Sequence, residues 1–460
     1  MLTVAYLANQ FPSAVEPYVI EEIEELRGRG VRVIATSVRK PKRIPANQCA
    51  PEIVLQSVSV IILLRAAWLC LRRWKLISPL IGRVAFRGGE GPIQRLKALL
   101  HTWLGACYAV MLKSEGIDHV HVHHGYFGSW IGMVAARLLD VGFSMTLHGS
   151  DLLLHGTYLD VKLEHCTFCL TVSEYNRRYI FENYVGVDPE KIIVSRLGVE
   201  VSERTRHLDH ALEHRGPGFT LLAVGRLHAV KDHAFLLRAC AQLHECGIDF
   251  ECSIAGDGPE RRRLQSLIAR YGLEHKVTLL GLVPREQMDS LYDRADVVVL
   301  TSRSEGIPLV LMEAMARGKI VVAPAITGIP ELVIPGKTGY LYEPGSLDDL
   351  VYRLLFIRSL VQASDGPRIH PFISSAARQL DCVRYAAQMQ IRHNFNRKKN
   401  LESFGSLFIK RATPQTVSTL HENFVLQQIQ LSLQRHGSIP VRTDAVDAVA
   451  GARRSAVFNV

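Results

Sequence analysis

Residues 304–318 read Ser-Glu-Gly-Ile-Pro-Leu-Val-Leu-Met-Glu-Ala-Met-Ala-Arg-Gly, and this stretch predicts the fold of the half of the chain that contains it. An apolar, β-branched run from Val297 to Leu300 comes just before it and is typical of a buried strand. Pro308 suits the first position of a helix, where its missing N–H costs nothing, and Gly318 suits the residue that ends the helix. A strand, a loop and a helix in this order form the repeating unit of parallel α/β sheets.

The loop and the start of this helix carry groups that suit a nucleotide sugar. Glu305 falls in the loop and Glu313 on the helix, and carboxylates accept hydrogen bonds from sugar hydroxyls. Free backbone N–H groups at a helix N-terminus bind phosphate. We therefore expect a donor phosphate to lie against four consecutive residues: Gly306, Ile307, Pro308 and Leu309. The alternative interpretation is an amphipathic helix with two solvated glutamates.

Two cations follow a second expected strand. Arg226 and Lys231 come after the strand Phe219 to Val224 and before the expected helix Ala234 to Leu243. Because the carboxyl ends of parallel strands meet at one edge of a sheet, we expect both to face the same cleft as Glu305. An arginine and a lysine together can neutralise a diphosphate, whereas the alternative is a pair of unrelated surface cations.

The chain opens with a strand at Leu2 to Leu7, a helix at Pro17 to Arg29 and a strand at Val31 to Thr36, which predicts a doubly wound parallel sheet. The fold class is therefore α/β, with two Rossmann-like, doubly wound domains that face a cleft. We expect the first domain at 1–202, with a basic amphipathic insertion at about 58–100. The polar segment 203–218 is the expected linker, and 219–381 the second domain.

Histidines mark the end of two further strands. His148 ends one of them before Gly149, whose lack of a side chain lets the backbone approach a ligand; the alternative is a structural histidine. The run His119 to His124 places alternate histidines on one strand face, a spacing that can hold a metal. No carboxylate or cysteine set beside it in the sequence completes a site, and Cys166 and Cys169 form a lone C-x-x-C pair. We predict no metal.

The two glutamates with seven residues between them, in a segment ending Glu-Ala-Met-Ala, resemble the signature of the retaining glycosyltransferases of family four, which have the GT-B fold. Gly225-Arg226-Leu227 followed by Lys231 is similar to the family's Gly-Arg-Leu and Lys-Gly pattern, with Asp232 in place of the glycine. This resemblance implies a final helix that crosses back to the first domain, which we place at 382–411. The tail 412–460 has no family counterpart.

The resemblance also implies roles for the residues that match the motifs. Glu305 would bind the donor sugar and His148 would orient it, and these two are the catalytic candidates. Arg226 and Lys231 would bind the donor phosphates, and Glu313 the ribose. The base would lie near Gly256, Gly281 and Leu282. The donor would be a UDP- or GDP-sugar, with no further cofactor, and its phosphate would take up the acceptor's proton.

The first loop resembles an exopolysaccharide subgroup of the family, of the colanic-acid type. Phe11-Pro12-Ser13 followed by Glu16 is similar to that subgroup's Phe-Pro-Ser and glutamate, although Pro17 and Tyr18 differ from its usual Thr-Phe. This likeness places Ser13 and Glu16 on the acceptor side. The alternative for Glu16 is an acid favoured by the dipole at a helix start.

Composition restricts the partners. The chain has 460 residues with a formal net charge of +10, which favours anionic partners. The apolar run Ile61 to Leu71 is too short and too charged to span a bilayer, and a mixture of basic and aromatic residues continues beyond it as far as Arg87. It can rest on an anionic membrane surface or pack as an ordinary helical insertion. Nine cysteines without regular spacing and the absence of a basic leader predict a cytoplasmic protein, peripheral to the membrane if the insertion binds lipid.

The sequence thus predicts a metal-independent retaining glycosyltransferase that moves a sugar from a nucleotide sugar to a glycan or lipid-linked acceptor in cell-surface polysaccharide biosynthesis. One alternative is an epimerase or hydrolase of nucleotide sugars on the same fold. Another is a non-catalytic scaffold at the membrane. Nucleic acid is not an expected partner, because the basic residues are not combined with base-stacking aromatics in a known module.

Overall fold

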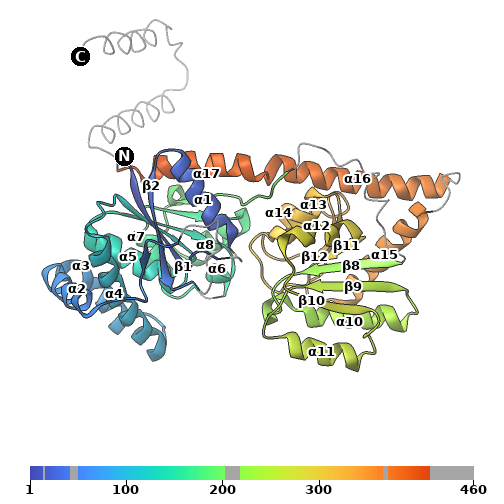
Figure 1. Cartoon of the computed structure of the whole chain (residues 1–460), viewed down its shortest axis with the longest axis horizontal. Coiled ribbons are helices and arrows are strands. Elements are labelled where there is room, and N and C mark those ends of the chain that lie inside the picture. The colour runs from blue at the N-terminus through green and yellow to red at the C-terminus, as the bar shows by residue number, and fades with distance from the viewer. Residues whose placement is uncertain (14–15, 42–49, 155, 202–217, 366–370, 415–460) are drawn as a thin grey trace, which may run out of the picture. The chain divides into compact units, whose positions relative to one another are not determined.

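The computed structural model describes residues 1–13, 16–41, 50–154, 156–201, 218–365 and 371–414 (Figure 1). The expected linker 203–218 lies outside the described residues except for Gly218, and so does the expected tail from residue 415 onward. The described part contains two separate parallel sheets covered by helices, which confirms the predicted α/β class.

The first sheet has seven parallel strands in the order β3-β2-β1-β4-β5-β6-β7. Their bounds are Thr3–Gln10 (β1), Arg32–Arg39 (β2), Ile53–Val54 (β3), His119–His123 (β4), Gly142–Leu147 (β5), Phe168–Thr171 (β6) and Ile192–Val194 (β7). The chain adds β2 and β3 on one side of β1 and then crosses to the other side, where β4 pairs with β1 in parallel. Ligands of open α/β sheets bind beyond the carboxyl ends of the strands at the point where the chain changes sides in this way.

Helices cover both faces of this sheet, as a parallel sheet requires. Their bounds are Pro17–Gly28 (α1), Phe127–Leu139 (α5), Ser150–Leu153 (α6), Leu159–His165 (α7) and Glu174–Asn183 (α8), with a short 3-10 turn at Pro189–Lys191 (η1). Val120 and Val122 of β4 lie in the core on one face, and the alternate histidines of β4 are buried on the other. Ser173 caps α8 by accepting a hydrogen bond from the Asn176 N–H, as its position at the strand end predicts.

The expected insertion forms three helices, α2 (Val60–Arg72), α3 (Trp74–Phe86) and α4 (Pro92–Leu112). One side of it belongs to the core of the first sheet, where Ala66, Leu69 and Leu80 are buried. The other side of α2 exposes Leu64 and Trp68 to solvent. None of the helices in the described ranges has both the length and the apolar content that a bilayer crossing needs.

The second sheet has six parallel strands in the order β10-β9-β8-β11-β12-β13. Their bounds are Phe219–Val224 (β8), Phe250–Ala255 (β9), Val277–Gly281 (β10), Val297–Val299 (β11), Ile320–Pro324 (β12) and Tyr340–Tyr342 (β13). The direction of winding reverses between β8 and β11. The loops that follow these two strands carry the predicted phosphate and sugar residues, so the reversal brings them to one edge.

The helices of the second sheet include the one predicted from the opening stretch. Their bounds are His233–Glu245 (α10), Arg261–Arg270 (α11), Arg285–Arg294 (α12), Leu309–Ala316 (α13), Ile329–Leu332 (α14) and Leu347–Asp365 (α15), with a 3-10 turn at Ala229–Lys231 (η2). Pro308 is the N-cap of α13 and not its first residue, because its ψ of 121° is extended.

The last described segment is two helices, α16 (Pro371–Asn394) and α17 (Arg397–Ala412), whereas the sequence predicts one helix over 382–411. The break comes at Asn396, whose side chain caps α17 by accepting from the Lys399 N–H. The backbone there pairs with Val199, which accepts from the Arg397 N–H at 3.0 Å. Phe408 of α17 lies in the core of the first sheet beside α1 (Figure 1).

Candidate functional site

Lys231 and Glu305 are brought together although 74 residues separate them. Lys231 ends η2 after β8, and Glu305 lies in the loop between β11 and α13. The Lys231 Nζ atom donates to Glu305 Oε1 at 2.5 Å, and both side chains are largely shielded from solvent. The Thr301 hydroxyl at the end of β11 also donates to the Lys231 carbonyl at 3.1 Å, which holds the two loops together.

Arg226 lies on the same loop but makes a different kind of contact. Its side chain is exposed, and among the described residues it has no hydrogen-bond or ion-pair partner. The part of the chain built on the first sheet (1–201, with α17) is called the first half here, and the part built on the second sheet (218–394) the second half. The charge of Arg226 reaches Tyr126 of the first half: burial raises the pKa of the Tyr126 hydroxyl, and the Arg226 guanidinium opposes that rise. Arg226 is therefore a cation near Tyr126 whose donors make no hydrogen bond to the residues that the structure describes.

Asp232, the residue that departs from the family pattern, has the backbone angle that the family's glycine would adopt. Its φ is 43°, in the left-handed region that glycine occupies without strain. Its carboxylate accepts from Arg303 Nε at 2.7 Å. The substitution thus keeps the turn and adds an ion pair with Arg303.

The loops of the two halves touch at two glycines. A side-chain carbon built on Gly306 would lie 2.0 Å from the carbonyl oxygen of His148, and one built on Gly149 would lie 2.8 Å from the Gly306 nitrogen. Both positions must therefore lack a side chain for the loops to meet. The sequence predicts that Gly149 lets the backbone approach a ligand; in this structure the backbone that approaches it is that of Gly306.

The His148 ring is held by the first half of the chain. Its Nε2 lies 3.0 Å from Nδ1 of His123, and Tyr18 stacks on it with ring centroids 4.6 Å apart. Burial and the nearby charge of His124 lower the pKa of His148 well below its ordinary value. His148 is therefore neutral at physiological pH, with its Nδ1 making no hydrogen bond to the residues that the structure describes.

A charged group next to His148 contains one of the predicted acceptor residues. Glu16 Oε1 lies 2.9 Å from His124 Nε2, and Asp151 lies on the other side of this ring at 3.6 Å. Burial opposes the imidazolium, but the two carboxylates outweigh it and raise the pKa of His124 to about 10. The sequence did not predict this role for His124. Ser13 is half-buried, and its carbonyl accepts from the Glu16 N–H at 3.2 Å.

A cavity of about 970 Å³ opens between the two halves, within the size range of small-molecule sites. Four of the predicted donor-side residues line it: Gly256, Leu282, Leu309 and Glu313. The Tyr292 hydroxyl donates to Glu313 Oε2 at 2.8 Å. Gly281 accepts from the Gly256 N–H at 2.8 Å, which fixes the turn on the base side. Lys231, Glu305 and His148 lie outside this lining, at the contact between the loops.

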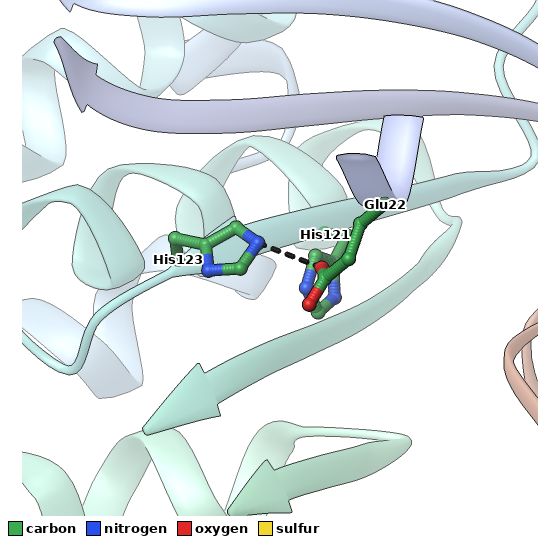
Figure 2. Close-up of side chains that lie close together, drawn as sticks. All are labelled: Glu22, His121 and His123. Atoms are coloured by element: carbon green, nitrogen blue, oxygen red, sulfur yellow. Dashed lines mark hydrogen bonds and ion pairs between the residues drawn. The ribbon is translucent and has the colours of Figure 1, made fainter. Parts of the chain in front are cut away.

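The histidine strand has a carboxylate partner that the sequence analysis missed. Glu22, on the buried side of α1, has an oxygen 3.0 Å from His123 Nε2 (Figure 2). One ligand atom each of Glu22, His121 and His123 lie within 4.8 Å of one another. A glutamate among the apolar positions Val19 and Ile23 was the available signal. His119 is not part of this group of three, and its Nε2 lies 2.7 Å from the Ser144 hydroxyl.

Within the described ranges, the C-x-x-C pair does not gather with other potential metal ligands. Cys166 and Cys169 are both buried free thiols, and burial raises the pKa of each. Their sulfurs donate to the backbone carbonyls of Leu163 and Leu170.

Two family models match the chain. The model of Glycosyltransferase Family 4 matches residues 15–203, and that of Glycosyl transferases group 1 matches residues 206–359. The chain is 39% identical over 176 residues to the putative colanic acid biosynthesis glycosyltransferase WcaL of Salmonella typhimurium, covering 37% of this chain and 43% of the relative. It is 31% identical over 265 residues to the amylovoran biosynthesis glycosyltransferase AmsK of Erwinia amylovora, covering 55% and 64%. The chain spans about half the length of the curated relatives it matches.

Solved structures share the fold. Sucrose-phosphate synthase from Thermosynechococcus elongatus superposes with a TM-score of 0.65 at 17% identity, over 89% of this chain and 99% of the other. The Anabaena protein Alr3699/HepE in complex with UDP and glucose superposes with a TM-score of 0.61 at 18% identity, over 89% and 100%. With the two family models adjoining along the two halves of the chain, this protein belongs to the glycosyltransferases of family four.

Proposed function

We propose that this protein is a retaining glycosyltransferase that moves a sugar from a nucleotide-sugar donor to a glycan or lipid-linked acceptor in cell-surface polysaccharide biosynthesis. The observation that carries the proposal is the contact of Lys231 with Glu305 where the winding of the second sheet reverses. It puts a cation for phosphate and a carboxylate for sugar hydroxyls side by side, in front of the N-terminus of α13.

The proposed donor site extends from this pair into the cavity. Glu313, held by Tyr292, would bind the ribose hydroxyls, and the base would lie against Gly256 and Leu282. Lys231 and the backbone N–H groups of Gly306, Ile307 and Leu309 would neutralise the charge that develops on the leaving diphosphate. The exposed guanidinium of Arg226 would add to them once a donor is bound.

On the acceptor side, Glu16 and Ser13 would face the incoming hydroxyl. The ion pair of Glu16 with His124 keeps this carboxylate next to His148, which would orient the donor sugar. The donor's own phosphate would take the acceptor proton, so that transfer occurs on one face of the sugar. The names of the relatives support a polysaccharide acceptor, and the ligands named for the Anabaena protein support a UDP-sugar.

The test is a panel of UDP- and GDP-sugars, measured first by calorimetry and then by product analysis with and without a lipid-linked glycan acceptor. We expect one donor to bind and its sugar to appear on the acceptor with the anomeric configuration retained. Turnover of the donor alone would replace the proposal by an epimerase or hydrolase. Absence of binding to every donor in the panel would leave a scaffold.

We further propose that the exposed side of α2 and α3 rests on an anionic membrane surface, where a lipid-linked acceptor is found. This side carries exposed apolar and basic residues: Ile61, Leu64, Trp68, Leu71, Trp74 and Phe86 with Arg65, Arg72, Arg73, Lys75 and Arg87. Such a mixture of aromatic and basic groups favours the interface of anionic bilayers.

Vesicle flotation tests this attachment. We expect binding to vesicles with phosphatidylglycerol, weak binding to phosphatidylcholine alone, and a decrease as salt rises. Trp68→Ala combined with Arg72→Ala should reduce binding roughly 30-fold or more, since a tryptophan that inserts into the membrane and a charge at its surface contribute roughly 1 kcal/mol or more each. Tyr352→Ala is the matched control, because Tyr352 is as exposed (60%) as Trp68 (56%) but lies on α15. Equal loss in both variants would contradict the proposal.

A further inference from the structure

We propose that Glu22 and His123 are positioning residues that hold the imidazole of His148 in one orientation and one tautomer through a chain of hydrogen bonds. The proposal rests on the proposed function, in which His148 orients the donor sugar. It assigns a role to Glu22 and His123, which are shown in Figure 2 and do not touch the donor in that scheme.

The chain of hydrogen bonds runs from Glu22 on α1 through His123 on β4 to His148, which follows β5. Glu22 Oε2 lies 3.0 Å from His123 Nε2, and His123 Nδ1 lies 3.0 Å from His148 Nε2. Figure 2 shows the Glu22 side chain reaching from its helix to the ring of His123. Glu22 is 5% exposed and His123 is 2% exposed, so neither can exchange its partner for water. The Tyr6 hydroxyl donates to the same Glu22 oxygen and fixes it further.

The Glu22 carboxylate fixes the donor and the acceptor of each hydrogen bond in this series. A carboxylate only accepts, so His123 must present its Nε2–H to Glu22. A neutral His123 then has a lone pair at Nδ1, and His148 must donate to it through Nε2–H. Burial lowers the pKa of His148, which keeps that ring neutral. The remaining nitrogen of His148, Nδ1, is therefore an acceptor, suited to a hydroxyl of the sugar and not to a carbonyl or phosphate.

The contacts of His121 argue against a metal ion in this cluster. Its Nδ1 lies 2.7 Å from the Ser144 hydroxyl and its Nε2 lies 3.1 Å from the Thr146 hydroxyl. Both ring nitrogens of His121 and both of His123 thus have hydrogen-bond partners without a cation. The carboxylate of Glu22 is held by Tyr6 and His123, so hydrogen bonds within the described residues already satisfy this group.

Protonation of the His123–His148 pair would reverse the chain, because His123 would then donate to His148 and Nδ1 of His148 would carry a proton. The pH at which this happens depends on the other titratable groups that face the two rings from β1, α1, β4 and α6: Tyr6, Glu16, Tyr18, His121, His124 and Asp151. The charges of His124 and Asp151 oppose one another at His148, and both stay in place when Glu22 is changed.

Glu22→Gln keeps the size of the side chain and removes its charge. We expect kcat to fall about tenfold or more while the donor KM stays within about twofold, because orientation and not donor binding is lost. The protonated His123–His148 pair loses its nearest negative charge, so its pKa falls and the acid limb of the kcat–pH profile moves to lower pH by about 1 unit. Glu24→Gln, the same change at an exposed position of α1, should leave the rate and the limb unchanged.

A second pair of variants covers the case in which Glu22→Gln folds poorly. The amide of His123→Asn can place an acceptor near the position of Nδ1, whereas His123→Leu cannot. We expect the asparagine variant to keep roughly tenfold more activity than the leucine variant. Equal activities, an unchanged acid limb in Glu22→Gln, or a stoichiometric metal whose removal lowers the activity would each overturn the proposal.

Histidine-selective ¹⁵N NMR of the full chain without donor separates this inference from the proposed function. The His148 signal, assigned with His148→Gln, should show a single Nε2–H tautomer that becomes mixed in Glu22→Gln. If this signature is found while no nucleotide sugar binds, the proposed function fails and the positioning chain stands. A mixed tautomer in the unaltered protein would overturn the chain itself.

Discussion

Glu305 and Lys231 compensate each other's charge in the structure, and both are largely shielded from water. A partly buried ion pair of this kind gains little stability, since removing two charges from water offsets most of their attraction. Under the proposed function, a diphosphate would attract Lys231 and leave the Glu305 oxygens to accept from sugar hydroxyls. On the other side of the loop contact, the carboxylates of Glu16 and Asp151 flank the imidazolium of His124.

We predict that Lys231→Ala lowers sugar transfer roughly 10²–10³-fold, because one of the groups that stabilise the leaving diphosphate is lost and Glu305 is left unpaired. Initial rates with the donor identified by the panel measure this loss. Lys231→Arg should recover part of the rate through its charge. Lys337→Ala, at an exposed turn of the same half, is the control, and a rate for Lys231→Ala equal to that control would contradict the role of Lys231.

At the scale of elements, the contact of two loops depends on the absence of side chains at Gly149 and Gly306. We predict that Gly306→Ala lowers transfer at least tenfold, because a carbon 2.0 Å from the His148 oxygen forces the loops apart and displaces Glu305. The melting temperature should change by only a few degrees, since the change lies outside both cores. Gly28→Ala, where nothing lies within 4 Å, is the matched control. Full activity of Gly306→Ala would show that the loops need not touch.

Helix α17 belongs to the core of the first sheet although it comes last among the described elements. Phe408 is fully buried and packs edge-on against Phe168 and His121 with ring centroids 5.5 Å and 5.1 Å away. We predict that Phe408→Ala lowers the free energy of unfolding by about 3–5 kcal/mol through loss of buried surface and the cavity left behind. Urea denaturation measures this, and Phe86→Ala, at a side chain that is 87% exposed, should change it by less than about 0.5 kcal/mol. Equal effects would mean that α17 packs loosely.

In the described part of the molecule, two polar connections join the halves in addition to the contact of Gly149 with Gly306. One is the passage from α16 to α17, where Arg397 donates to Glu21 of α1 at 2.7 Å. The other is Glu331 of α14, whose carboxylate accepts from the N–H groups of Tyr175 at 2.7 Å and Glu174 at 3.1 Å. An acid from one half thus caps the first turn of α8 in the other, where the helix dipole favours a negative charge.

Buried histidines make the stability of this molecule depend on pH. Burial lowers the pKa of His119 to about 3, below its unfolded value, so the unfolded state binds the proton more readily and stability is lost as pH falls from about 6.5 toward 3. His124, with its pKa raised to about 10, contributes stability below about 6.5 that is lost as pH rises through 10. We predict a melting temperature that falls on both sides of neutrality.

His119→Gln, which keeps an amide near Ser144, should flatten the acid side of that profile and leave the alkaline side unchanged. Thermal melts between pH 4 and pH 10 measure both limbs. An acid limb as steep in the variant as in the unaltered protein would assign the acid sensitivity to other groups, such as Asp151, whose pKa lies well below its usual range because, despite burial, its carboxylate is paired with His124.

Local sequence patterns are enough to predict the strands and helices and their order along the chain. The strand and helix around Glu305, the opening β–α–β segment and the capping by Ser173 follow from apolar period, proline, glycine and hydroxyl positions, which act over a few residues. Because parallel strands all end at the same edge of their sheet, this order also predicts that the loops after β8 and β11 lie at one edge, where the structure brings Lys231 to Glu305. The roles of the site residues remain predictions.

Which distant side chains share a buried space depends instead on how the elements pack. Glu22 reaches His123 because α1 crosses the face of β4, and the break at Asn396 turns the last helix onto the first sheet through its pairing with Val199. Gly149 meets Gly306 because the two halves approach there. Such contacts depend on how whole faces pack, which no local pattern specifies, since a buried polar group is stable only when packing supplies its partner.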